Sequence, residues 1–523
     1  MDLKDNEKDV YGVSEKVYEV PSDHAIHTNA HDADAAAKLV AGFTGELDPV
    51  EAKRVLGKID RNMLPMMMIL YLVQFMDKTT LGNSVNLGLK TDNHLTSLQY
   101  NWLGTIFYLA YLVFEYPQNL ALQRFPAGRW MSLNILCWSI FLMCHAACHN
   151  FVGLFICRLG LGICEGSITA GFLVTTTMFY THAESSRRVG FWFLMNGTAQ
   201  IVSGFLAYGI LHSKSSFAPW RIFMLTTGLI TLVVAVWFLL RFPNNPMDAK
   251  FLSKEEKVIA IERIRSNQSG VENKHWKKDQ FIETLLDWKT WAFFLFAALD
   301  NVPNSLTNQN SIIIKSLGFT ALQTTLLGCV SGVIEIITIY TGTLCVKKYP
   351  NARAIIGTIY FIPNIIGSAL ILGLPFSNKT GQLIALYITG VGTTGFVLSL
   401  AWITAVTAGH TKKVTTNAIM LIGYCLGNLC APQMWKAEYS PKNTIPWIVI
   451  LVCYTACPII MLCIAYFLQK ENRRRDTLPE SEVASQDNYM DEIQTDGTVI
   501  SKKVDLGFMD LTDRQNLRFR YAL

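Results

Sequence analysis

Long apolar stretches alternate with short polar ones over most of the chain. Twelve windows are almost free of charge, and each is long enough for an α-helix to cross a bilayer, which takes about 20 residues. The windows lie near 63–85, 100–122, 130–148, 151–178, 189–211 and 220–241, and then near 289–314, 322–345, 353–374, 381–405, 415–435 and 445–468. The pattern predicts an all-α membrane protein with twelve transmembrane helices.

Charged residues gather outside these windows and suggest the domain boundaries. The chain divides into an N-terminal tail (1–60), a six-helix bundle (61–242), a central loop (243–288), a second six-helix bundle (289–468) and a C-terminal tail (469–523). Both tails lack apolar periodicity, so we expect them to be disordered. The central loop contains a capped amphipathic segment, 252–265, which is expected either to lie along the membrane surface or to be a solvated linker helix.

The two halves share a short motif at equivalent places. Residues 124–129 (Arg-Phe-Pro-Ala-Gly-Arg) follow the second window, and residues 348–353 (Lys-Tyr-Pro-Asn-Ala-Arg) follow the eighth. Internal repeats of this kind are typical of transporters that hold substrate at mid-membrane between two bundles. The repeat predicts two pseudo-symmetric bundles.

Loop charges predict the orientation in the membrane. The loops assigned to the inside carry a modest excess of Lys and Arg, which the central loop and Arg473-Arg474-Arg475 strengthen. Both termini are therefore expected to be cytosolic. The first 60 residues lack the pattern of a cleaved signal peptide.

Composition narrows the class further. The 523 residues are 51% hydrophobic and only 16% charged, whereas soluble domains carry about 25% charged residues. The net charge of +5 gives no reason to expect a nucleic-acid partner. We find no phosphate-binding glycine loop and no nucleophile triad, so neither an enzyme nor an ATP-driven pump is supported. Cys144 and Cys148 with their neighbouring histidines have the wrong spacing for a haem or zinc site, and no metal is expected.

Two charged residues stand inside the apolar stretch 151–180. Arg158 and Glu165 are seven residues apart, which is two helical turns, so both project from one face. Charges inside a membrane helix are costly and persist where they line a cavity or meet a partner. Apolar surroundings favour the protonated form of Glu165, the condition for a proton-binding carboxyl near neutral pH.

Asp77 and Lys78 add two more charges, in the first window. Adjacent helical residues point about 100° apart, so Asp77 is expected to face Arg158 while Lys78 stays free to meet an anion. The alternative is a buried ion-pair network that only fixes helix packing, and a functional role is favoured for the four residues as a group.

Other candidates are polar residues in neighbouring windows. Tyr108 and Tyr111 are one turn apart and are expected either to reach a substrate carboxylate or only to pack. The seventh window is rich in Asn, with Asn304 and Asn308 on one face, and Pro303 predicts an interruption of that helix. Glu115 and Glu335 are expected to be conformational ion-pair partners near helix ends.

Several motifs resemble the major facilitator superfamily, and within it the fungal allantoate-permease branch of the anion:cation symporters. They include 76–82 (Met-Asp-Lys-Thr-Thr-Leu-Gly), Arg158 to Gly166, 220–223 (Trp-Arg-Ile-Phe), 242–246 (Phe-Pro-Asn-Asn-Pro), 408–413 with 416–418, Gly423-Tyr424 with Gly427-Asn428, and the tail segments 510–513 (Asp-Leu-Thr-Asp) and 519–523 (Phe-Arg-Tyr-Ala-Leu). Lys78 and the Pro-Asn-Asn-Pro turn look most like a sub-branch that contains a fungal cysteine transporter and a thiamine-pathway transporter.

The resemblance implies roles for matching positions. Glu165 would be the proton site, with Asp77 and Arg158 as a gating ion pair. Lys78 stands where wider relatives have an Arg that holds the substrate carboxylate, and it cannot clamp a carboxylate bidentately. Tyr111 matches a substrate-side tyrosine, and Tyr424 completes the expected substrate-binding set. The basic residues of the repeated motif, Arg124, Arg129, Lys348 and Arg353, would serve the inner gate, although Gln123 replaces the usual acidic residue there.

The function that follows is proton-coupled uptake of a small organic anion, such as a carboxylate, a vitamin precursor or an amino-acid-like compound. With Glu165 protonated, Asp77, Lys78 and Arg158 sum to +1, and a monovalent anion would neutralise the site. No cofactor other than the proton gradient is expected, and the protein should act as a monomer in the plasma membrane or the endoplasmic reticulum membrane. The alternatives are a nutrient sensor that does not transport, and an exporter of the same fold.

Overall fold

We describe a computed structural model of the chain. It describes residues 48–265, 277–349, 351–479, 489–493, 499–503 and 511–523. The predicted N-terminal tail therefore lies mostly outside the described residues. Its last part was wrongly expected to be disordered, because helix α2 (Pro49–Asn86) begins there, with the Asp48 side chain accepting a hydrogen bond from the Val50 amide at 2.9 Å.

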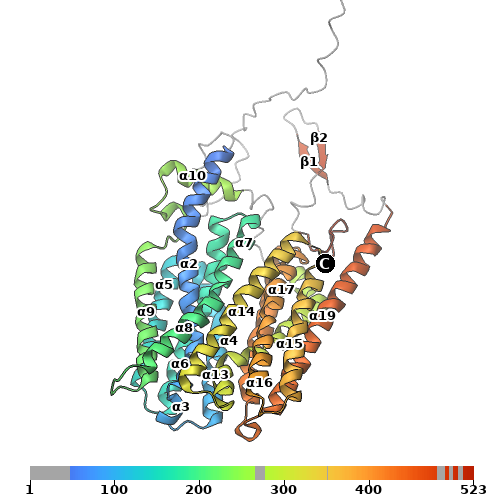
Figure 1. The fold of residues 1–523 in the computed structure, drawn as a ribbon. Coiled ribbons are helices and arrows are strands. Elements are labelled where there is room, and N and C mark those ends of the chain that lie inside the picture. The colour runs from blue at the N-terminus through green and yellow to red at the C-terminus, as the bar shows by residue number, and fades with distance from the viewer. Residues whose placement is uncertain (1–47, 266–276, 350, 480–488, 494–498, 504–510) are drawn as a thin grey trace, which may run out of the picture. The chain divides into compact units, whose positions relative to one another are not determined.

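Helices form both predicted bundles (Figure 1). After α2, the first bundle contains α4 (Ser97–Arg124), α5 (Ala127–Cys144), α6 (Phe151–Phe179), α8 (Met195–Leu211) and α9 (Pro219–Arg241), with the short helices α3 (Leu89–Asp92) and α7 (His182–Phe193) between them. The second contains α12 (Trp288–Asp300), α13 (Leu306–Ser316), α14 (Ala321–Lys348), α15 (Arg353–Gly373), α16 (Lys379–Ile388), α17 (Thr393–Ala405), α18 (His410–Cys430) and α19 (Thr444–Asp476). Each predicted span falls on one helix or on consecutive helical segments.

The two bundles repeat the same helix pairings. In the first, α4 packs on α6, α5 on α9, and α2 on α8. In the second, α14 packs on α17, α15 on α19, and α12 on α18, which are the equivalent pairs. The internal repeat predicted from the sequence is thus a repeat of packing as well as of sequence.

Matching caps begin the second helix of each half. Thr96 and Gln99 form a capping box at the start of α4, and Thr320 and Gln323 form one at the start of α14. Both helices are 28 residues long and end at the basic residue that opens the repeated motif, Arg124 or Lys348. The same local signals therefore set both ends of these helices.

Within the described residues, nine helical segments are long and apolar enough to span a membrane. The predicted spans that fall short are α2, α4 and the α12–α13 pair, which carry many of the polar residues of the candidate site. Polar residues lower the hydropathy of a span where it lines an interior cavity rather than lipid.

Two spans are broken near their middle. The break between α12 and α13 is the 3₁₀ turn η4 (Pro303–Ser305), at the proline that predicted it. A second break, η5 (Thr389–Val391), separates α16 from α17 and was not predicted. There the Tyr454 hydroxyl donates to the Thr389 carbonyl at 3.2 Å, which satisfies a backbone group beside the break.

The central loop packs on the bundles through two helices. Helix α10 (Lys254–Arg265) contacts α2 and α6, and ion pairs join Lys58 to Glu256 and Arg263 to Glu184. Helix α10 is thus fixed to the first bundle, and its position at the membrane surface or in solvent stays a prediction. Helix α11 (Lys278–Leu286) packs on α18 of the second bundle.

The C-terminal tail was wrongly expected to be disordered in its described parts. Helix α19 continues to Asp476, and residues 489–493 and 499–503 form the antiparallel strands β1 (Tyr489–Ile493) and β2 (Val499–Lys503). Residues 511–523 pack on the second bundle. There Asp513 is fully buried and forms ion pairs with Lys289 of α12 and with Lys412 of α18, the latter at 2.9 Å.

The last residues of the chain extend this contact. The Trp402 indole donates to the Ala522 carbonyl at 2.8 Å, and the Arg353 amide donates to the Leu523 carbonyl at 2.9 Å. Arg475 donates to the Phe519 carbonyl at 2.9 Å. These partners come from α15, α17 and α19, so the segment fastens several helices at one end of the second bundle.

Candidate functional site

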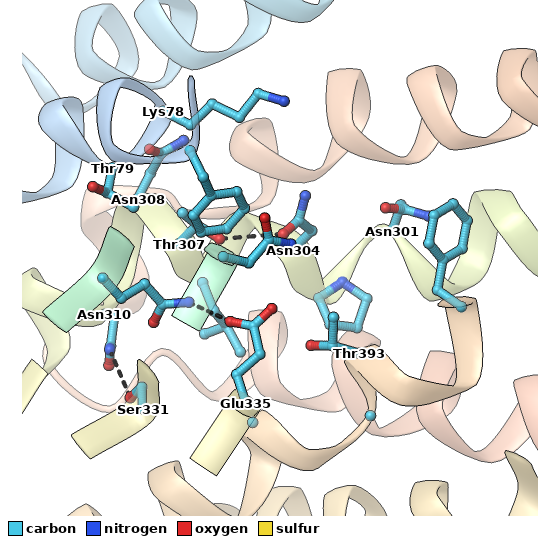
Figure 2. Close-up of a pocket in the computed structure, with 18 of the residues that line it drawn as sticks. Lys78, Thr79, Asn301, Asn304, Thr307, Asn308, Asn310, Ser331, Glu335 and Thr393 are labelled. Carbon is cyan, nitrogen blue, oxygen red and sulfur yellow. Dashed lines mark hydrogen bonds between the residues drawn. The ribbon is translucent and has the colours of Figure 1, made fainter. Parts of the chain in front are cut away.

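A cavity of about 300 Å³ lies between the two bundles. Its walls come from α2, α4, α6, α7 and α8 on one side, and from α12, α13, α14, α16, α17, α18 and α19 on the other. Most of the predicted site residues line it: Lys78, Tyr108, Tyr111, Arg158, Asn304, Asn308, Glu335 and Tyr424. Figure 2 shows part of this lining, with Lys78 above and Glu335 below the Asn304 region.

Lys78 and Glu165 form an ion pair in the wall made by the first bundle. The Lys78 Nζ lies 2.8 Å from Glu165 Oε1, and Glu165 is 1% exposed. Glu165 therefore faces the protein interior rather than lipid. The sequence led us to expect Lys78 to be free, and that expectation is wrong because Lys78, not Arg158, reaches Glu165.

Arg158 is a buried cation that pairs with no carboxylate among the described residues. Its side chain is 3% exposed, its Nη2 lies 3.4 Å from Thr80 Oγ1, and its Nε has no hydrogen-bond partner. In the described part of the chain, no carboxylate oxygen lies within 4.0 Å of this guanidinium. A buried guanidinium with an open donor beside a cavity is suited to a planar anion such as a carboxylate.

Asp77 points away from the cavity, into the first bundle. Its Oδ2 accepts hydrogen bonds from Trp138 Nε1 of α5 at 2.8 Å and from Thr231 Oγ1 of α9 at 2.9 Å. The expected ion pair with Arg158 is not formed, because Trp138 and Thr231 hold the carboxylate on the other side of α2. Asp77 thus links three helices of the bundle.

Tyrosines from both bundles meet beside the cavity. Tyr108 of α4 lies with its ring centroid 6.5 Å from that of Tyr424 of α18, in an edge-on arrangement. Tyr111 lines the cavity one turn further along α4. The three rings give the cavity an amphipathic wall that spans the bundle interface.

Asparagines surround the break in the seventh span. Asn304 Nδ2 donates to Asn428 Oδ1 at 2.6 Å, and Asn428 Nδ2 lies 3.2 Å from Asn301 Oδ1. Asn308 lines the cavity and accepts a hydrogen bond from the Tyr100 hydroxyl through its carbonyl, at 2.9 Å. Asn428 thus anchors the break to α18.

Glu335 was expected near a helix end, but it lies midway along α14. It is 6% exposed, lines the cavity and accepts a hydrogen bond from Gln200 of α8. Glu115 is half-buried on α4 and does not line the cavity. No ion pair involves either carboxylate in the part of the chain that the structure describes, so neither forms the expected pair in this conformation.

The basic residues of the repeated motif lie outside the cavity. Arg124 ends α4 and Lys348 ends α14, both exposed, while Arg129 and Arg353 lie at the starts of α5 and α15. Across the described residues, none of the four forms an ion pair. Their role in a gate stays a prediction.

The sequence analysis missed several polar residues of the cavity. Gln200, Asn196 and Asn310 line it, as do Thr389 and Thr393 beside the second helix break. Single amides in apolar windows carry little signal. Gly390 and Gly392 were the signal in the sequence for this break, because two closely spaced glycines weaken a helix.

Hydrogen bonds between the bundles close the cavity toward the end at which α3 lies, which we call the α3 end. Asn101 Nδ2 donates to the Trp435 carbonyl at 2.7 Å, and Gln433 Nε2 donates to Thr105 Oγ1 at 2.8 Å. At the opposite end, where α10 lies (the α10 end), no hydrogen bond or ion pair joins the bundles among the described residues. Figure 1 shows α3 and α10 at opposite ends of the first bundle.

Comparison with known proteins identifies the class. The model of the major facilitator superfamily matches residues 67–432. The thiamine pathway transporter THI73 of Saccharomyces cerevisiae is 35% identical over 499 residues, which covers 94% of this chain and 90% of that protein. The allantoate permease of the same yeast is 32% identical over 91% of this chain and 88% of that protein. The high affinity cysteine transporter of the same yeast is 30% identical over 91% of this chain and 92% of that protein.

Solved structures agree with this fold. A crystal structure of the proton:xylose symporter XylE bound to 6-bromo-6-deoxy-D-glucose has a TM-score of 0.62, at 13% identity, and covers 79% of this chain and 96% of that one. The chain therefore belongs to the major facilitator superfamily, in the branch of the allantoate permease. It is an integral multi-pass membrane protein and a transporter, not an enzyme.

Proposed function

We propose that this transporter couples the uptake of a small organic anion to protons by alternating access. The observation that carries the proposal is the Lys78–Glu165 ion pair of 2.8 Å, with the unpaired Arg158 lining the same cavity. Protonation of Glu165 would remove the partner of Lys78. Lys78 and Arg158 could then both bind the carboxylate of a substrate.

Charge balance links the proton to the anion. Within the first bundle, with Glu165 protonated, Asp77, Lys78 and Arg158 carry −1, +1 and +1, which sum to +1, and the carboxylate of a bound substrate brings the sum for this bundle to zero. A neutral loaded site crosses the occluded state at lower cost than a charged one, because charges in a low-dielectric interior are expensive. Without substrate, deprotonated Glu165 neutralises Lys78 instead. Proton and substrate would therefore move together.

The loop charges support an orientation of the cavity in the membrane. The α10 end carries Arg124, Arg129, Lys347, Lys348 and Arg353, and cytosolic loops are enriched in such residues. We therefore propose that the α10 end and both termini are cytosolic, so that the bundles are joined on the outer side. One chain encloses the whole cavity, which supports action as a monomer, and we propose the plasma membrane as its location.

The test uses the purified protein in proteoliposomes loaded with a pH-sensitive dye. Allantoate and cysteine serve as probes because relatives carry those names. At least one of them should acidify the lumen of wild-type vesicles, and an inside-alkaline gradient should speed its uptake. Glu165→Gln should lose the response to the gradient, and Arg158→Ala should lose uptake although the protein still folds.

Glu51→Gln is the matched control, because Glu51 is an exposed carboxyl on the same helix as Lys78 and lies outside the cavity. It should behave as wild type. Wild-type uptake that ignores the proton gradient would overturn proton coupling. Binding without any uptake would favour a sensor, and net movement only out of the lumen under an opposed gradient would favour an exporter.

A further inference from the structure

The ionisable side chains that line the cavity are sorted by bundle. Its basic residues, Lys78 and Arg158, come from the first bundle, and its acidic residues, Asp300 and Glu335, come from the second. The cavity thus has a cationic wall and an anionic wall. A substrate that carries only a carboxylate uses one of these walls and leaves the other facing it.

The anionic wall has no cation of its own. Throughout the described residues, no Lys or Arg nitrogen lies within 4.0 Å of the carboxylate of Glu335 or Asp300. An ionisable group inside a membrane protein is expensive unless it meets a partner or serves a ligand or ion pathway. The buried carboxylate of Glu165, by contrast, has an ion-pair partner in Lys78. Glu335 instead faces the space that substrate would fill.

The surroundings of Glu335 favour it over Asp300 as a ligand group. Glu335 is held at the bundle interface by the hydrogen bond from Gln200 of α8, one helix away from the cationic wall. Asp300 lies at the end of α12, and among the described residues no hydrogen bond joins its side chain to the first bundle. Glu335 is therefore the acidic residue of the lining that a hydrogen bond connects to the first bundle.

Close packing keeps this interface in register. A Cβ on Gly197 of α8 would lie 2.3 Å from the Gly332 carbonyl of α14, so the two backbones are in contact one turn from Glu335. The amide of Gln200 is therefore presented to the Glu335 carboxyl by rigid helices rather than by loops. Preorganised groups of this kind give a ligand site its specificity.

We propose that the substrate of this cavity is a zwitterion, whose carboxylate binds Arg158 and Lys78 and whose ammonium, or other cationic nitrogen, binds Glu335. This rests on the proposed function and narrows its substrate class to amino-acid-like compounds. The two ends of one molecule would then connect the two bundles. Such a substrate favours closure around itself, whereas a simple monoanion engages only the first bundle.

The experiment compares matched pairs of ligands on the full-length protein in detergent. Each pair is an ω-amino acid and the acid that lacks only its nitrogen: β-alanine with propionate, 4-aminobutyrate with butyrate, and 5-aminovalerate with valerate. Three lengths sample the separation of the two walls. Affinity is measured as a ligand-induced shift in thermal unfolding at the pH at which proton-driven uptake is fastest. In at least one pair, the amino acid should bind more tightly than its partner.

Glu335→Gln decides the assignment. The amide still accepts a hydrogen bond from Gln200 but has no charge, so folding should be preserved. Loss of one charge-assisted hydrogen bond predicts about a tenfold weaker affinity for the preferred amino acid, with the monoanion little changed. Glu51→Gln, which changes an exposed carboxyl outside the cavity, should keep the wild-type preference.

Other outcomes overturn the proposal. The proposal would be refuted if, in all three pairs, the monoanion bound at least as tightly as the amino acid. It would also be refuted if Glu335→Gln still bound the amino acid more tightly than the monoanion. A preference lost in Asp300→Asn instead would move the cation site to α12 and refute the role of Glu335. If only monoanions shift the thermal unfolding, and the shift requires Arg158, the zwitterion proposal fails while the proposed function stands. A ligand-induced shift that survives in Arg158→Ala would count against both the zwitterion proposal and the proposed function.

Discussion

Lys78 and Glu165 lie 2.8 Å apart across the α2–α6 contact, in the wall that the first bundle contributes to the cavity. The pair means that the cation nearest to the predicted proton site is occupied until the carboxyl takes up a proton. Desolvation makes such a pair costly to break on one side only, because the remaining charge has no partner. This asymmetry can be measured.

A double-mutant cycle tests the pair. Lys78→Met leaves Glu165 without its counter-charge and should lower stability by about 3 kcal/mol if the carboxylate stays ionised. Glu165→Gln leaves Lys78 facing the cavity and should cost less, because Lys78 is the more exposed partner, at 19% against 2% for the side chains. The double variant should recover part of the loss. Thermal unfolding of the four purified proteins at neutral pH gives the coupling, and simple additivity would show that the pair is not energetically linked.

Asp77 should behave as a packing residue. It accepts hydrogen bonds from Trp138 and Thr231, and an amide oxygen can accept the same two bonds. Asp77→Asn should therefore stay close to wild type in thermal stability, whereas Asp77→Ala leaves the Trp138 indole N–H unsatisfied, while Thr231 can still donate to the Thr227 carbonyl, and should cost about 1–3 kcal/mol. If the two variants lose stability equally, the charge of Asp77 matters more than its hydrogen bonds. Retained proton coupling in Asp77→Asn would remove it from the proton-coupling set.

How far the sequence could predict this site depends on the kind of information each residue needs. The spacing of Arg158 and Glu165 placed both on one helical face, and Pro303 marked the break in the seventh span. The partner of each charge could not be predicted, because Asp77 and Lys78 differ by about 100° around α2 and only the packing angle between helices decides which one faces α6. Glu335 already lay near the middle of the predicted window 322–345, so its expected place near a helix end did not follow from the extent of that window, and α14 confirms the central position.

The docked C-terminal segment was missed for a different reason. Some of its contacts pair residues more than two hundred positions apart, as between Lys289 and Asp513. Its apolar residues follow no helical or strand period, so local patterns carry no sign of burial. The tail motif was visible in the sequence, but its structural role required tertiary contacts.

A glycine contact between α8 and α14 predicts a conformational effect. A Cβ at Gly197 would lie 2.3 Å from the Gly332 carbonyl, and a backbone atom cannot move aside cheaply. Gly197→Ala should therefore force the bundles apart there, lower thermal stability by about 1–3 kcal/mol and slow transport. Gly209→Ala is the control on the same helix, because a Cβ there has no atom within 4 Å. Equal behaviour of the two variants would show that this contact does not limit the transport cycle.

The ion cluster around Asp513 predicts a pH-dependent docking of the C-terminal segment. Lys412 lies 2.8 Å from Asp287 and 2.9 Å from Asp513, and the Tyr521 hydroxyl donates to Asp513 at 2.8 Å. Burial alone would raise the pKa of Asp513, but the ammonium groups of Lys289 and Lys412 outweigh it and lower that pKa to about 2. The docked pKa lies below the undocked value of 3.8. The carboxylate therefore stabilises docking above about pH 4, and this contribution is lost as the pH falls toward 2.

At neutral pH the shift corresponds to about 2 kcal/mol in favour of the docked segment. Asp513→Asn should remove that contribution and leave Lys289 and Lys412 with one counter-charge fewer, so the amides of residues 511–523 should exchange with solvent about tenfold faster or more. Asp476→Asn is the matched control, because Asp476 pairs with Arg520 in the same region but at the exposed surface, with 62% of its side chain accessible. Its effect should be small, since exposed pairs contribute little. Hydrogen exchange read out by mass spectrometry compares the three proteins, and an Asp513→Asn segment as protected as the wild type would show that apolar contacts, not the ion cluster, hold the end of the chain.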